Sequence, residues 1–202
     1  MISPRSERPT PGEMTAGKAI SDSGIEPIGR TCWAYASMIR TQTRLKYANG
    51  YLDLGMTREA AQELDSISPE DRESTETLTM CVRLYLESKK WFRMTLTAKE
   101  LSKREPKNPF GWVNWAYALR ERNRIKDARS VAKAGLEYVS NDAILWFNYA
   151  CYCSLLGDVE EASEYLDKAI SLDKRFEAES VSDTDLDNLW KWIHNQDSKA
   201  EA

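Results

Sequence analysis

The chain has 202 residues, of which 42% are hydrophobic and 30% charged, and its formal net charge is −4. It contains no run of the roughly 18 apolar residues that a membrane-spanning helix needs, so it is not an integral membrane protein, and the length fits one globular domain or slightly more. The four cysteines are too few and too irregularly placed for a disulfide scaffold, and no apolar segment near the start directs secretion. These features predict a cytoplasmic protein.

Residues 1–30 hold four of the seven prolines and four of the nine glycines, and they show no helical or strand periodicity. This composition predicts a disordered leader. A targeting or partner-binding arm is the alternative, although acidic residues interrupt the basic, amphipathic pattern of an organelle presequence. The remaining prolines, Pro69, Pro106 and Pro109, fall between helix-patterned stretches and mark helix boundaries.

From residue 41 onward the sequence repeats with a period of 34 residues. Four pairs of similar residues have this spacing: Trp112 and Trp146, Ala116 and Ala150, Ala128 and Ala162, Gly135 and Ala169. The pattern extends backward to give four units, at about 41–74, 75–108, 109–142 and 143–176. Small residues at fixed places let neighbouring helices approach closely, while bulky ones fill the spaces between them.

The repeat resembles the tetratricopeptide repeat (TPR) family, whose unit is a 34-residue helix–turn–helix, and especially its small bacterial members. The match is best over 143–176, with Trp146, Ala150, the turn Gly157-Asp158 and Ala162. The resemblance implies an all-α, right-handed superhelical solenoid of about four helix pairs over residues 31–202. A capping helix at about 183–195, with Leu186, Leu189, Trp190 and Ile193 on one face, is expected to cover the last repeat.

The sequence offers little for catalysis, cofactors or metals. His194 is the only histidine and is expected on the exposed side of the capping helix. Cys151 and Cys153 lie about 200° apart around a helix, so they do not share a metal ion, and Cys81 and Cys153 fit buried packing positions. The chain has no Gly-rich phosphate loop. We therefore expect no enzyme, no cofactor and no metal site.

Charge is distributed unevenly along the chain. Residues 82–133 hold 14 Lys and Arg against 5 Asp and Glu, a net of +9, and residues 134–202 hold 5 against 15, a net of −10. A basic band is predicted at Lys89, Lys90, Arg93, Arg120, Arg122, Arg124, Lys126, Arg129 and Lys133. It would be solvated surface, steer an acidic partner, contact RNA phosphates, or meet the acidic third of another copy. The aromatic residues fall at core positions, which argues against nucleic acid.

The TPR resemblance implies a concave groove lined by the first helix of each repeat, where the family binds peptide segments. The residues it places there are Asn49, Arg83, Asn114, Tyr117, Arg120, Phe147 and Asn148. A fitting partner would put an apolar side chain near Tyr117 and Phe147 and a carboxylate near Arg83 or Arg120. We expect a non-catalytic protein-binding adaptor; the alternative is RNA or polyanion binding by the basic band.

Overall fold

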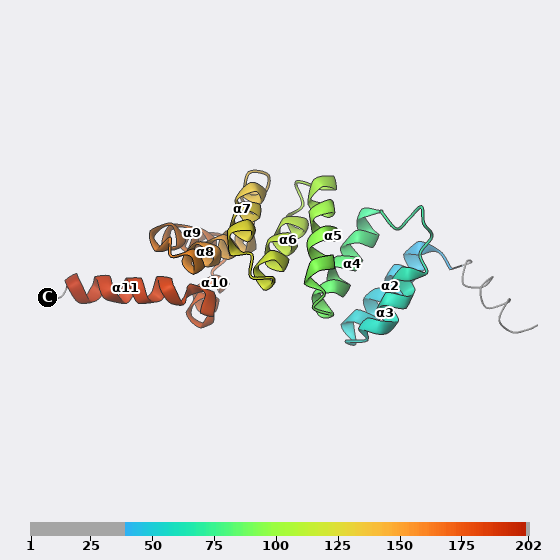
Figure 1. Cartoon of the computed structure of the whole chain (residues 1–202), viewed down its shortest axis with the longest axis horizontal. Helices are drawn as coiled ribbons and strands as arrows, with labels where there is room; N and C mark the ends of the chain where they lie inside the picture. The colour runs from blue at the N-terminus through green and yellow to red at the C-terminus, as the bar shows by residue number, and fades with distance from the viewer. Residues whose placement is uncertain (1–38, 201–202) are drawn as a thin grey trace, which may run out of the picture.

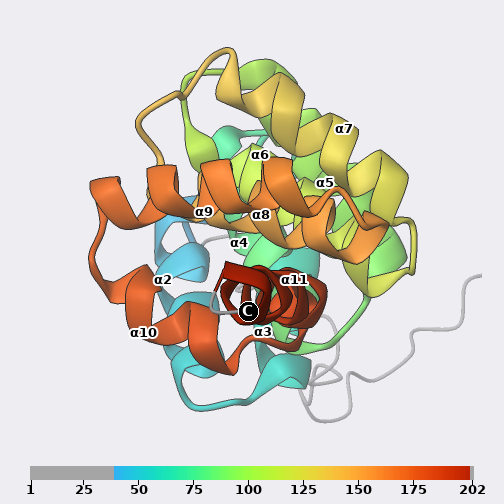
Figure 2. The same cartoon turned by 90° about the vertical axis from the view of Figure 1, so that its left-hand side faces the viewer.

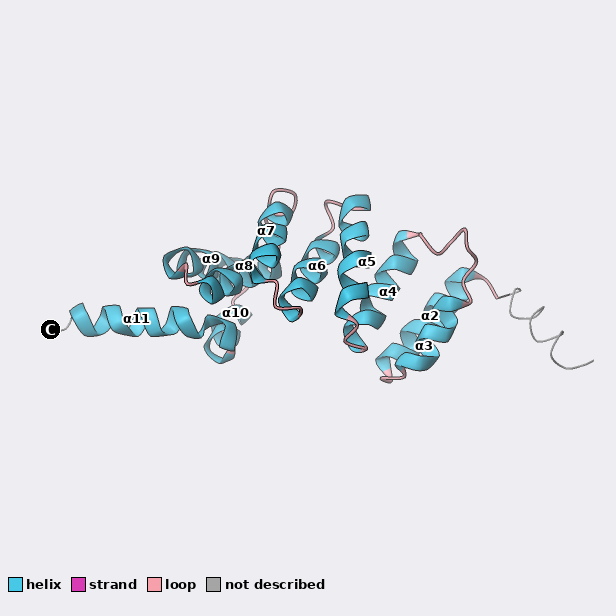
Figure 3. Ribbon diagram, viewed as in Figure 1, coloured by secondary structure: helices cyan, strands magenta, loops and turns pink. Residues whose placement is uncertain are grey.

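A computed structural model describes residues 39–200, and all regular structure in that range is helical (Figure 3). The elements are α2 (Thr41–Asp53), α3 (Thr57–Asp65), α4 (Thr75–Glu87), α5 (Trp91–Arg104), α6 (Pro109–Glu121), α7 (Ile125–Leu136), α8 (Ala143–Leu156), α9 (Val159–Leu172), α10 (Arg175–Ser182), the 3₁₀ helix η1 (Thr184–Leu186) and α11 (Asp187–Ala200). The leader predicted over residues 1–30 lies outside the described residues.

The helices form antiparallel pairs, α2 with α3, α4 with α5, α6 with α7 and α8 with α9. The pairs follow one another along an elongated molecule, with α2 and α3 near one end and α11 at the other (Figure 1). Viewed along the long axis, α11 points toward the reader beside the α8–α9 pair (Figure 2). The predicted all-α stack of four helix pairs is confirmed.

The backbone of the turn inside each pair repeats with the same period. Gly55, Lys89, Asn123 and Gly157 have φ of 72°, 51°, 57° and 87°, the left-handed conformation. The next residue donates its amide to the carbonyl five positions back, at 2.8 to 3.0 Å in all four turns. This geometry is the Schellman helix end, which satisfies carbonyls that the helix leaves without partners. Asn123 therefore adopts the left-handed conformation that glycine adopts in repeats one and four. Lys89 adopts it in repeat two at a steric cost.

The starts of the first helices also repeat, with one exception. Ser74, Asn108 and Asp142 accept backbone amides at 3.2, 3.0 and 2.8 Å at the beginnings of α4, α6 and α8. Short polar side chains at this position satisfy amides that the helix cannot. The equivalent residue before α2, Arg40, makes no side-chain cap. The first repeat therefore begins with a less defined helix end than the other three.

Trp112 and Trp146 make the same hydrogen bond in successive repeats. Each indole nitrogen donates to the carbonyl six residues earlier, on Pro106 at 2.9 Å and on Ser140 at 2.8 Å. Gly135 lies so close to Trp112 that a Cβ added to the glycine would sit 2.9 Å from the tryptophan Cβ. The small residue at this place is therefore required by helix packing.

The core divides between the two halves of the stack. One large cluster of buried apolar residues extends from α6 to α11. Two smaller clusters lie in the N-terminal half: one among α2, α3 and α4, and one where α4 and α5 contact α6. The C-terminal end has more parts than the predicted capping helix at about 183–195, because α10 and η1 precede α11. Leu186 and Leu189 are fully buried. No described helix is both long and apolar enough to cross a membrane.

Candidate functional site

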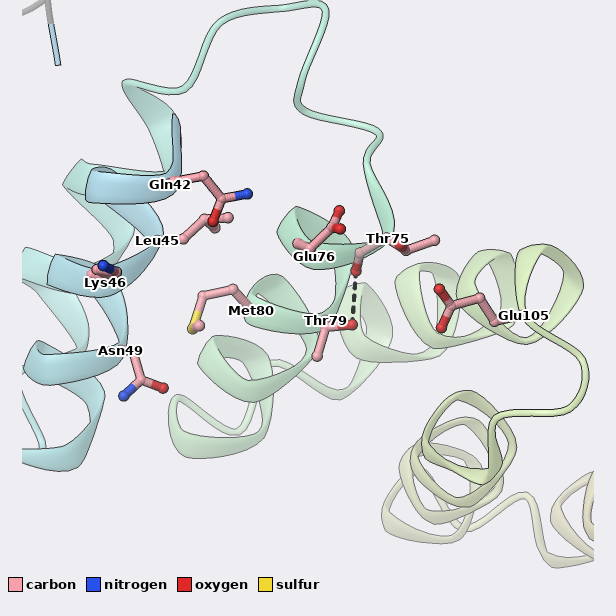
Figure 4. A pocket seen from close by; sticks show the side chains of 9 residues that line it. All are labelled: Gln42, Leu45, Lys46, Asn49, Thr75, Glu76, Thr79, Met80 and Glu105. Carbon is pink, nitrogen blue, oxygen red and sulfur yellow. Dashed lines mark hydrogen bonds between the residues drawn. The ribbon is translucent and has the colours of Figure 1, made fainter. Parts of the chain in front are cut away.

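A hollow lined mainly by residues of the first helices lies between α2 and α4 (Figure 4). It has a volume of about 540 Å³ and is lined by Gln42, Leu45, Lys46, Asn49, Thr75, Glu76, Thr79, Met80 and Glu105. Leu45 is buried and Met80 partly buried, whereas Lys46 and Glu76 are exposed. We call this hollow the N-terminal pocket: it has an apolar floor and a polar rim.

Helical spacing produces this lining. Residues three or four apart share one helix face, so Gln42, Leu45, Lys46 and Asn49 project together from α2. Thr75, Glu76, Thr79 and Met80 do the same on α4, where the Thr79 hydroxyl donates to the carbonyl of Thr75 at 2.7 Å. That bond occupies the hydroxyl donor, so Thr79 offers mainly its methyl group and an acceptor to the pocket.

A polar cluster closes one end of the N-terminal pocket and unites two predicted groove residues. Arg83 on α4 donates to Asn49 and pairs with Asp53 at 3.0 Å, and Asn49 donates to Asp53 at 2.9 Å. The three side chains hold one another across α2 and α4. Because Arg83 and Asp53 are both substantially exposed, the pair adds little stability, but it fixes the orientation of the Asn49 amide.

The other predicted groove residues meet the chain's own C-terminal segment. Arg120 makes two hydrogen bonds to the carboxylate of Asp185, one of them at 2.8 Å, and a third to Glu121 at 2.7 Å. Asp185 is only 9% exposed. The sequence placed a partner's carboxylate near Arg120; in the structure, η1 supplies that carboxylate.

Phe147 is also covered from within the chain. It is 6% exposed, and its ring stacks on Phe176 of α10 with centroids 4.6 Å apart. The remaining space is a hollow of about 160 Å³, lined by Tyr117, Arg120, Glu121, Asn148, Cys151, Tyr152, Asp183 and Asp185. A partner side chain therefore has no access to Phe147 in this structure.

Three further predicted residues have internal contacts. Tyr117 remains 36% exposed and meets Trp91 edge-on at 5.9 Å. The amide of Asn114 donates to the carbonyl of Phe110 at 2.8 Å, and Asn148 lines the small hollow beside Asp183. The structure thus brings Tyr117, Arg120 and Asn148 together, and separately Asn49 and Arg83.

Sequence reasoning missed Asp185 and Phe176 as groove residues. Asp185 falls within the predicted capping helix at about 183–195, and Phe176 at the end of the repeat predicted over 143–176. The sequence did contain a hint. The predicted groove was expected to bind a carboxylate and an apolar side chain, and Asp183, Asp185 and Leu186 supply both just beyond the last repeat. Nothing in the 34-residue period showed that this segment folds back.

The basic band is largely engaged within the chain. Arg124 pairs with Asp127 at 2.7 Å, Arg129 with Asp158 at 2.5 Å and with Glu161, and Arg122 donates to Thr95 at 3.2 Å. Lys126 and Lys133 line an open hollow of about 410 Å³ beside Arg129. Most guanidinium groups of the band are therefore already paired, which reduces what it offers to phosphates.

The described thiols are buried or partly buried, and the histidine lies at the surface. Burial raises the pKa of Cys81 to about 11 and of Cys153 to about 12, and it also raises the pKa of Cys151. Such thiols stay protonated near neutral pH and are weak nucleophiles and ligands. His194 is exposed, with Nδ1 2.7 Å from the carbonyl of Trp190. Within residues 39–200, no group of three His, Cys, Asp or Glu side chains is placed to hold a metal.

Comparison with known proteins identifies the architecture. A family model described as tetratricopeptide repeat matches residues 143–176. The chain is similar to TTC0263, a thermophilic TPR protein of Thermus thermophilus, with 21% identity, a TM-score of 0.56, and coverage of 66% of this chain and 75% of that one.

Structures of MamA are similar as well. One has 14% identity, a TM-score of 0.61, and coverage of 80% of this chain and 94% of that one; another, named MSR-1, has 17% identity and a TM-score of 0.59, covering 73% and 90%. At these identities the likeness concerns the fold. No curated protein matches the sequence.

Proposed function

We propose that this chain, which has a tetratricopeptide-repeat fold and matches that family's model over residues 143–176, is a non-catalytic adaptor that binds an extended segment of a partner protein in the N-terminal pocket. The observation that carries this proposal is the difference in access along the groove. The pocket between α2 and α4 is open at about 540 Å³, whereas Asp185 and Phe176 fill the groove beside α6 and α8.

The lining specifies the chemistry of the segment. Leu45 and Met80 form a floor for one apolar side chain, whose burial would supply most of the affinity. On the rim, Lys46 would face a carboxylate, and Glu76 and Glu105 would face a basic group. The partner segment therefore has an apolar residue flanked by charges of both signs. Charges on the rim of an interface affect the association rate more than the affinity.

Pre-organisation supports the same surface. Asn49 donates to Asp53 and accepts from Arg83, so its amide is held in one orientation before any partner arrives. A polar group fixed in advance loses less entropy on binding. Asn49 nevertheless has a free amide hydrogen, since its nitrogen carries two donors, and that hydrogen is directed to the partner backbone in our proposal.

A random peptide library displayed on phage and selected on the wild-type protein tests the proposal. We expect enriched peptides with an apolar residue next to charges, which then bind in solution. Thr79→Arg should reduce their affinity by about tenfold or more, because the new side chain fills the pocket. Asn49→Ala should weaken binding and Asn148→Ala, the matched control at the filled half, should not.

Two results would contradict the proposal. Selected peptides that bind Thr79→Arg as well as the wild type would place the binding surface elsewhere. An absence of selected peptides, together with salt-sensitive binding of heparin and single-stranded RNA that Lys126→Glu and Lys133→Glu abolish, would favour the polyanion alternative.

A further inference from the structure

The outer face of α5 carries a protruding apolar pair. Phe92 is 61% exposed and Leu96 is 55% exposed, and they are four positions apart, so they are neighbours on one helix face. Arg93 and Lys99 are exposed on the same helix, and the guanidinium of Arg122 lies over the Phe92 ring at 5.1 Å from its centroid. We call Phe92, Leu96, Arg93 and Lys99 the α5 knob.

The charge of the knob is not balanced locally. Glu100 is the one acidic residue of α5, and it pairs with Arg104 at 2.8 Å. Lys99 lies 5.4 Å from the Trp115 ring, a contact that leaves its positive charge without a carboxylate. Single exposed apolar residues are ordinary, but a contiguous apolar pair rimmed by like charges is typical of an interaction surface.

A hollow of complementary character lies on the second helix of the last repeat. It has a volume of about 460 Å³ and is lined by Trp146, Glu164, Tyr165, Asp167, Lys168 and Ser171. Trp146 and Tyr165 stack with centroids 5.2 Å apart, and the indole nitrogen of Trp146 is already bonded to Ser140. The rings therefore present an apolar wall, and the rim carries two carboxylates and one ammonium. We call this hollow the α9 socket.

We infer that the α5 knob of one copy docks in the α9 socket of a second copy. The apolar pair fits an aromatic wall, and Arg93 and Lys99 meet Glu164 and Asp167. The knob does not reach the socket of its own chain, because α6, α7 and α8 lie between α5 and α9 along the stack (Figure 1). Since the two surfaces differ, the contact is head-to-tail, and each added copy leaves one knob and one socket free.

This association is independent of peptide binding. Neither the knob nor the socket shares a residue with the N-terminal pocket. A protein that fails to select peptides would still associate, and a monomeric protein would still bind them. A contact made by two apolar and four charged side chains is small and belongs with weak, transient interfaces, so micromolar dissociation constants are expected.

Sedimentation velocity of the full chain measures the association. At low salt the average mass should rise with protein concentration, and it should fall toward the monomer as salt shortens the Debye length from about 30 Å at 0.01 M to about 3 Å at 1 M. Phe92→Ala should weaken association by about tenfold or more, as expected for a central aromatic. Leu54→Ala removes another exposed leucine, 74% accessible and belonging to neither surface, and should change nothing.

Charge reversal identifies the two surfaces as partners. The double variant Arg93→Glu with Lys99→Glu, and the double variant Glu164→Lys with Asp167→Lys, should each be monomeric. A mixture of the two variants should associate again, because each reversed surface meets its opposite. All four positions are at least partly exposed on helices, so circular dichroism should show folded proteins.

Three outcomes would overturn the inference. A monomeric wild type at high micromolar concentration and low salt would exclude the contact. Association that survives both double variants would place the interface elsewhere. A mixture that stays monomeric, although each variant alone has lost association, would show that the knob and socket do not bind one another.

Discussion

The N-terminal and C-terminal halves of the stack use the same repeat and differ in what occupies their groove. Between α2 and α4 the side chains Asn49, Asp53 and Arg83 bond with one another at the surface and leave a pocket beside them. Beside α6 and α8 the chain supplies its own contacts through Asp185 and Phe176. A groove position in a repeat family therefore does not by itself indicate a surface open to a partner.

The difference follows from how a solenoid ends. The last repeat exposes an apolar face that needs cover, and here α10, η1 and α11 provide it. Because the cover includes Leu186 and Leu189, both fully buried, it belongs to the same core cluster as α8 and α9. Filling the groove at Arg120 is thus coupled to closing the core, and a partner would have to break that core to enter.

Of the proposed variants, Leu186→Ala in the C-terminal half should have the largest effect on stability. Removing a fully buried leucine side chain should lower the free energy of unfolding by about 3 kcal/mol, measured by urea denaturation. Leu54→Ala, at an exposed turn in the N-terminal half, should change it by less than about 0.5 kcal/mol. Peptides selected on the N-terminal pocket should keep their affinity for folded Leu186→Ala; a parallel loss would mean that the two halves are not separable.

Two arginine variants should change the unfolding free energy by intermediate amounts and so compare the filled and the open groove directly. Arg120→Ala leaves Asp185 buried without its partner and should cost about 1–3 kcal/mol of unfolding free energy. Arg83→Ala breaks an exposed pair and should cost less than about 1 kcal/mol. Equal costs in chemical denaturation would contradict the distinction between a filled and an open groove.

Turn variants test the smallest expected difference. Lys89→Gly in the N-terminal half should relieve left-handed strain and raise stability by about 0.5–1 kcal/mol, after the entropy that glycine adds to the unfolded chain. Asn123→Gly in the C-terminal half should gain less, because asparagine tolerates this conformation. Thermal unfolding of both variants measures which one gains more stability. A larger gain for Asn123→Gly would show that something other than backbone strain determines the stability of these turns.

The parts of the fold that could be predicted are those fixed over a few residues. Left-handed turns at Gly55 and Gly157 and helix boundaries at Pro106 and Pro109 are local preferences of single residues. The part of the site that could be predicted is Asn49 and Arg83, because each lies at a repeating position on a first helix. The pairing of Arg120 with Asp185 joins residues 65 positions apart, and no period links them.

The sequence by itself determined the repeat, since helix propensity, turn conformation and the spacing of small and large residues act within one 34-residue unit and recur four times. Only the tertiary structure decided which part of the groove is open. That outcome depends on where a non-repeating segment finds buried contacts for Phe176, Asp185 and Leu186, and such contacts arise from the packing of distant elements. The same packing places the knob of α5 and the socket of α9 on separate parts of the surface.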